Sequence, residues 1–63
     1  MNTKEILEKI AAETGSRHLD SMLSALEDGE ALASLGIRDE DQEAVECAHS
    51  AVVEMMANGH KVY

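Results

Sequence analysis

Residues 39–58 read DEDQEAVECAHSAVVEMMAN. The stretch opens with Asp39, has Gln42 three residues later and is followed by an Asn58-Gly59 stop, which is the pattern of a capped helix. Acidic residues crowd its first turn, where the helix dipole is positive and favours them. We therefore predict a long C-terminal helix over residues 40–58 with Asp39 as its N-cap. Its apolar stripe is expected to consist of Val45, Ala48, Val52, Met55 and Met56.

Two further amphipathic segments precede this helix. Asn2 and Glu5 can form a capping box, and Gly15 can end the segment in a left-handed conformation, which predicts a helix over residues 3–14. Ser16 is the expected N-cap of a second helix over residues 17–28, which Asp28 and Gly29 end or kink. A short helical turn from about residue 30 to residue 35 should complete the set.

No segment alternates polar and apolar residues long enough to predict a strand, and the links between the helices are short. We therefore expect an all-α fold, a compact bundle of three to four short helices in a single domain over residues 1–63. Residues 60–63 are expected to form a loose tail. The core is predicted to contain Ile6, Ile10, Leu19, Leu23, Leu26, Leu35, Val45 and Val52.

The composition limits both stability and partners. A chain of 63 residues with no Phe and no Trp has a small core, so a homodimer stays open as a source of extra stability. Thirteen acidic residues against five basic ones give a net charge of −8. This charge argues against direct binding to nucleic acid or to an anionic membrane, and it favours a protein partner with a basic surface.

The cellular location is predicted from absent features. No apolar run approaches the roughly 20 residues of a membrane span, and the first residues lack the basic and apolar segments of a signal peptide. The single cysteine, Cys47, fits a reducing compartment. We expect a cytoplasmic protein.

The acidic residues around the start of the last helix are the main candidate for a partner-binding surface. Such a surface could occupy a groove rich in Arg and Lys, although the alternative is a face that is only solvated. Val53, on the exposed flank of the same helix, is a candidate apolar contact. A calcium loop is not predicted, because no central glycine follows Asp39 at the required spacing. The candidate binding set is Asp39, Glu40, Asp41, Glu43, Glu46, Val53 and Glu54.

Residues capable of catalysis or metal binding are few and scattered. Cys47 and His49 lie roughly 160° apart around one helix, so they cannot share a metal ion. His49 is expected to be half-buried beside the apolar stripe, and neither His18 nor His60 shares a predicted face with another ligand or base. We therefore predict no catalytic residues, no metal site, no cofactor and no enzyme activity.

Asp20-Ser21-Met22 resembles the Asp-Ser-Leu/Met tripeptide of acyl and peptidyl carrier proteins. In that family the serine carries phosphopantetheine, so the resemblance implies Ser21 as an attachment site. The small size, the acidity and the helical pattern are also similar to that family. The sequence departs from the family pattern in its short link before Ser21, which is expected to fall in the second turn of its helix rather than at its start.

Three functions follow from these observations. The favoured one is a small acidic regulator or inhibitor that binds a protein partner such as a nucleic-acid-binding machine, as some phage and mobile-element products of this character do. The first alternative is an adaptor or small subunit of a larger assembly. The second alternative is a carrier-like protein that uses Ser21.

Overall fold

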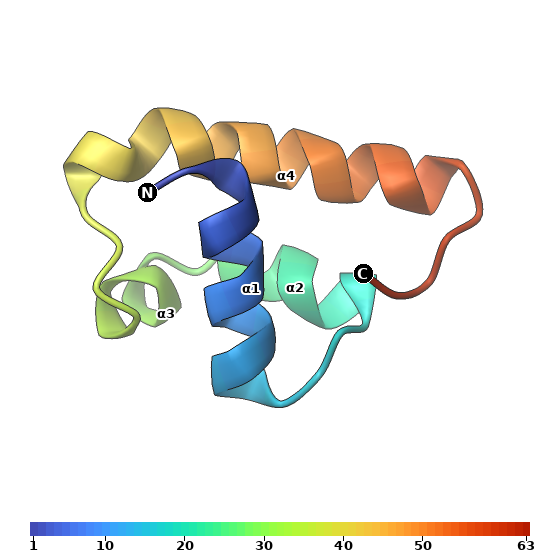
Figure 1. The fold of residues 1–63 in the computed structure, drawn as a ribbon, viewed down its shortest axis with the longest axis horizontal. Helices are drawn as coiled ribbons and strands as arrows, with labels where there is room; N and C mark the ends of the chain where they lie inside the picture. Colours follow the sequence, from blue (N-terminus) through green and yellow to red (C-terminus); the bar gives the residue numbers. More distant parts are fainter.

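The computed structural model describes residues 1–63, and it confirms the all-α prediction. The longest helix lies along one side of the molecule, and the first two helices pack against it (Figure 1). None of the helices is both long and apolar enough to cross a membrane. The elements are α1 (Thr3–Thr14), α2 (Leu19–Leu26), α3 (Gly29–Ser34), the 3₁₀ turn η1 (Asp39–Asp41) and α4 (Gln42–Ala57).

Helix α1 begins and ends as its sequence predicts. The side chain of Asn2 accepts a hydrogen bond from the Glu5 N–H at 2.9 Å, and the Glu5 carboxylate accepts one from the Asn2 N–H at 3.3 Å. Gly15 ends the helix with a φ of 69°, a conformation that costs a residue with a Cβ atom more than it costs glycine. The capping box and the glycine stop are therefore confirmed.

Helix α2 starts later and ends earlier than the predicted range of residues 17–28. Its N-cap is His18, whereas the Ser16 hydroxyl accepts a hydrogen bond from the His18 N–H at 3.2 Å and does not cap the helix. The segment before the helix is extended because it pairs with the C-terminal tail. At the other end, Asp28 caps α3 by accepting hydrogen bonds from Glu30 N at 3.0 Å and Ala31 N at 3.4 Å.

The start of α4 also differs from the prediction. Asp39 does not cap α4; it is the first residue of η1, and Asp41 occupies the N-cap position. The Asp41 side chain makes no capping bond to α4, because it is turned toward the backbone of Arg38 and the amino terminus. A 3₁₀ turn before a helix is a common way to tighten its first residues.

The tail over residues 60–63 is tied to the link between α1 and α2, which corrects the expectation of a loose tail. The Leu19 N–H donates to the Lys61 carbonyl at 2.9 Å, and the Tyr63 N–H donates to the Arg17 carbonyl at 2.8 Å. His18 and Val62 form an isolated antiparallel bridge. This contact could not be predicted from local sequence patterns, because its two sides lie more than forty residues apart.

The core lies where α1, α2 and α4 meet. Six of the eight predicted core residues are buried, but Leu23 and Leu35 are only half-buried at its edge. Helix α2 has only eight residues, and Met22 rather than Leu23 points to the centre. The buried set is Ile6, Leu7, Ile10, Ala11, Leu19, Met22, Leu26, Ile37, Val45, Ala48 and Val52.

Candidate acidic interaction surface

The candidate acidic residues do not share one environment. Asp39, Glu40, Glu43, Glu46 and Glu54 are exposed, and none of them takes part in an ion pair. Val53, on the same helix, exposes 44% of its surface. Asp41 alone is largely enclosed, with 11% of its side chain exposed.

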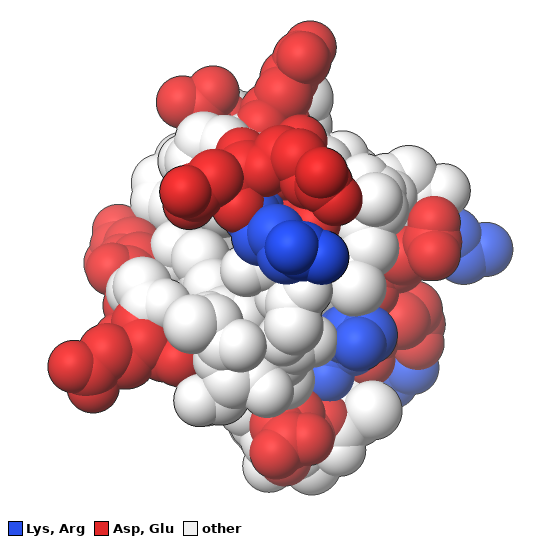
Figure 2. All heavy atoms as spheres, turned by 90° about the vertical axis from the view of Figure 1, so that its left-hand side faces the viewer, with Lys and Arg blue, Asp and Glu red and all other residues white.

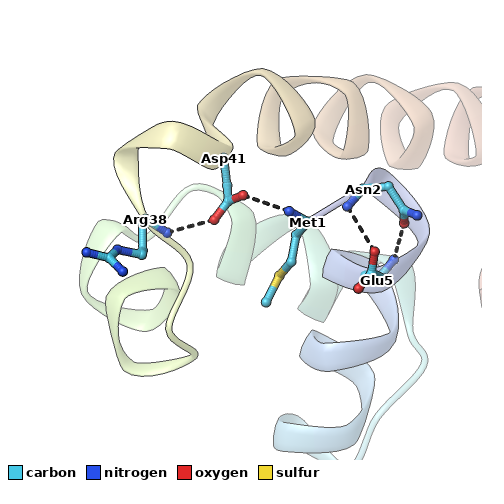
Figure 3. A network of polar contacts seen from close by, with 5 residues as sticks. All are labelled: Met1, Asn2, Glu5, Arg38 and Asp41. Carbon is cyan, nitrogen blue, oxygen red and sulfur yellow. Dashed lines mark hydrogen bonds and ion pairs between the residues drawn. The ribbon is translucent and has the colours of Figure 1, made fainter.

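Asp41 holds the amino terminus against the start of α4 (Figure 3). Its Oδ1 accepts a hydrogen bond from the Met1 ammonium group at 2.8 Å, and its Oδ2 accepts one from the Arg38 N–H at 3.1 Å. The bond from the ammonium group, followed by the bond from Arg38, lowers the pKa of the Asp41 carboxyl below its ordinary value. The same bond raises the pKa of the Met1 amino group.

This contact removes Asp41 from the set of carboxylates that a partner could reach freely. Both of its oxygens already have donors, and its charge is balanced by the ammonium group 2.8 Å away. Asp41 is therefore a structural residue of the start of α4. The sequence could not separate it from its neighbours, because its partner lies 40 positions away in the chain.

The remaining acids of α4 gather on its outward side. The inward side carries Val45, Ala48 and Val52, which are buried against α1 and α2. At about 100° per residue, Glu43, Glu46 and Glu54 fall within an arc of about 80° on the opposite side. Hereafter the outer face of α4 means the shallow depression of about 360 Å³ lined by Glu43, Glu46, Cys47, Ser50, Ala51 and Glu54.

Both the shape and the charge of the outer face favour the approach of a cationic partner. Cys47, Ser50 and Ala51 are small, so the helix backbone can be approached closely between the carboxylates. The end of the molecule where η1, α3 and the start of α4 lie is covered by more acidic than basic side chains (Figure 2). Such a surface produces a negative potential that attracts and orients cationic groups.

Cys47 and His49 of α4 are the residues that the sequence offered for nucleophilic or metal chemistry near the outer face. Cys47 is exposed, with no base hydrogen-bonded to it. His49 is half-buried, as expected, and its Nε2 lies 3.1 Å from a Glu27 carboxylate oxygen. No group of three or more His, Cys, Asp or Glu side chains is arranged to hold a metal ion.

Ser21, the residue that resembles a carrier attachment site, is exposed. It falls in the first turn of α2 and not in the second, because the helix begins at Leu19. The link from Gly15 to His18 that precedes α2 is only four residues long. The structure therefore corrects the position of Ser21 within its helix, and the short link remains a departure from the carrier pattern.

Comparison of the chain with protein-family models, with curated protein sequences and with solved structures found no match.

Proposed function

We propose that this chain is a non-catalytic regulator or inhibitor that binds a basic protein partner through the outer face of α4. The observation that carries the proposal is the cluster of exposed carboxylates without ion pairs on the unpacked side of the longest helix. Asp39 and Glu40 in η1 extend the same negative surface beyond the helix start.

Repulsion between the carboxylates of the outer face is a reason to expect a binding partner outside this chain. Like charges three or four residues apart on a helix reduce its stability by roughly 0.2–0.5 kcal/mol per pair. Glu43 and Glu46 form such a pair, and neither is offset by a cation of this chain. A partner that supplies Lys or Arg side chains would relieve this repulsion when it binds. The surface suits a groove that itself binds nucleic acid, because such grooves carry the required positive charge.

The same charge argues against self-association through this face, because two copies would bring the carboxylates together. A homodimer would need another surface. The adaptor and carrier alternatives remain open, but no contact in the structure favours either of them over the acidic-surface proposal.

The test compares two double variants that have the same net charge. Glu43→Gln with Glu46→Gln removes two carboxylates from the outer face. Glu13→Gln with Glu30→Gln removes two exposed carboxylates from α1 and α3, and neither side chain takes part in an ion pair. The wild-type protein and both variants would be immobilised and exposed to a lysate of the source organism, and the retained proteins would be quantified by mass spectrometry.

The proposal expects a protein that the wild type and the Glu13/Glu30 variant retain and that the Glu43/Glu46 variant loses. Affinity measured with that purified protein should fall as salt increases, and the association rate should fall more than the dissociation rate rises. Retention that is equal for the two variants for every bound protein would contradict a role for the outer face.

A further inference from the structure

A second concave region lies at the opposite end of α4, away from the outer face. It is a cavity of about 380 Å³ between the start of α2, the end of α4 and the returning tail. This volume is at the small end of the range for ligand pockets in proteins, so it suits a small group rather than a large cofactor. Its lining is His18, Leu19, Asp20, Met56, Gly59, His60 and Lys61.

The lining gathers basic side chains on a protein that has few of them. The chain has three histidines and five Lys or Arg residues, and this one cavity takes two of the histidines and one lysine. Neither Lys61 nor the ring of His18 or His60 is part of any ion pair or side-chain hydrogen bond. These groups are therefore free to meet a ligand.

The backbone holds these residues in place around the cavity. The Lys61 carbonyl accepts the Leu19 N–H at 2.9 Å, and the His60 N–H donates to the Met55 carbonyl at 3.0 Å. His18 is bridged to Val62 in the tail. Because the main chain is fixed by its own hydrogen bonds, the side chains of His18, His60 and Lys61 can be engaged without rebuilding the fold.

One carboxylate opposes this positive character. Asp20 lines the same cavity, and no ion pair in the structure neutralises it. Its negative charge should weaken the binding of an anion, whereas Lys61 should strengthen it. The rings of His18 and His60 add N–H groups that can donate hydrogen bonds to an anion. The N–H group of Asp20, a lining residue at the start of α2, has no acceptor in the protein and adds a further donor.

From this arrangement we infer that the cavity binds a small oxyanion, the chemical group of a phosphate or a carboxylate, through Lys61, His18 and His60. The site is separate from the outer face of α4 and does not depend on the function proposed for that face. The negative charge of Asp20 opposes this binding.

The experiment is a titration of the whole chain, followed by NMR at the ring protons of His18 and His60 and at the Asp20 amide. The probes are sulfate, which represents phosphate, and acetate, which represents a carboxylate. Sodium chloride at matched ionic strength and the same pH is the reference. We expect saturable shifts with at least one oxyanion. The probe that binds more tightly shows whether the cavity prefers a phosphate-like group or a carboxylate.

Two variants with opposite expected effects on binding, and two controls with the same changes in net charge, make the test specific. Lys61→Gln should weaken oxyanion binding roughly two- to fivefold, the size expected for one exposed charge pair, and Asp20→Asn should strengthen it by a similar factor. Lys4→Gln and Glu30→Gln change the net charge equally but lie outside the cavity, so they should leave the affinity unchanged. Lys61→Gln keeps the carbonyl that holds the tail, so the fold is retained.

Shifts that do not saturate, or that sodium chloride reproduces, would overturn the inference. So would equal effects of Lys61→Gln and Lys4→Gln, because binding would then follow net charge alone. Oxyanion binding that weakens in Lys61→Gln but not in Lys4→Gln, with the chloride response unchanged, would support the cavity as the site.

Discussion

The two ends of α4 are each held by a segment from one end of the chain, but by different chemistry. At the first end, the Met1 ammonium group and Asp41 form an ion pair at 2.8 Å. At the second end, the tail returns to the start of α2 (Figure 1). Backbone hydrogen bonds join it to the link before α2, and Leu19, which donates one of them, has a buried side chain. The first end therefore depends on charge, and the second depends on hydrogen bonding and apolar packing.

The two ends of α4 should therefore respond to different conditions. An ion pair near the surface weakens when either partner changes its protonation state or when salt screens it. Backbone hydrogen bonds beside a buried side chain respond instead to changes in packing. The two ends can therefore be perturbed separately, by pH at one and by core substitutions at the other.

The largest effect is expected from Leu19→Ala at the second end. Leu19 exposes 1% of its surface, so truncating it should lower the free energy of unfolding by roughly 2–5 kcal/mol. A domain of this size has a total stability of only about 3–9 kcal/mol. Urea unfolding measures the loss, and amide exchange at Tyr63 reports whether the tail loosens with it.

Leu23→Ala is the matched control for Leu19→Ala. Both changes remove the same atoms from α2, but Leu23 is only half-buried. It should therefore cost less than Leu19→Ala and leave the protection of the Tyr63 amide closer to that of the wild type. An equal loss in the two variants would show that burial beneath the tail does not distinguish them.

The second effect is the pH dependence of the first end. The pKa of Asp41 is lowered from its ordinary value of 3.8, so its contribution to stability is present above that pH and is lost as the pH falls through the folded-state pKa. The pKa of the Met1 amino group is raised from its ordinary value of 8.0, so its contribution is present below that pH and is lost as the pH rises through the folded-state pKa. The difference in unfolding midpoint between the wild type and Asp41→Asn should therefore be greatest between these two limits.

Acetylation of the Met1 amino group distinguishes the acidic decline of stability from the alkaline decline. It removes the ammonium charge, so the alkaline decline should disappear. Part of the acidic decline should remain, because the Arg38 N–H still donates to Asp41 at 3.1 Å. An Asp41→Asn protein that keeps the wild-type pH profile would show that this ion pair contributes nothing to stability.

The local parts of the fold could be predicted from the sequence, whereas the contacts between distant segments could not. The limits of α1 follow from Asn2, Glu5 and Gly15, which all lie within or beside the helix that they cap. The start of α2 was misplaced because its decisive partner is the tail, and the role of Asp41 was missed because its partner is Met1. Neither His18 nor His60 was predicted to share a face with another ligand or base, and the two line one cavity because the tail returns.

The smallest effects on the free energy of unfolding are expected from the exposed acids at the first end. They should distinguish Asp41, which stabilises the fold, from Glu43 and Glu46. Glu46→Gln should raise the free energy of unfolding by about 0.2–0.5 kcal/mol, because it relieves repulsion from Glu43 three residues earlier. Glu43→Gln should change it little, since the same relief is offset by a lost interaction with the helix dipole in the first turn of α4. Asp41→Asn should lower it. Urea unfolding at low and high salt measures all three, and the gain in Glu46→Gln should vanish at high salt, where the repulsion is screened. A loss of stability in Glu46→Gln would reveal a partner for Glu46 within the chain. The charge of the outer face would then serve to stabilise the fold rather than to bind a partner.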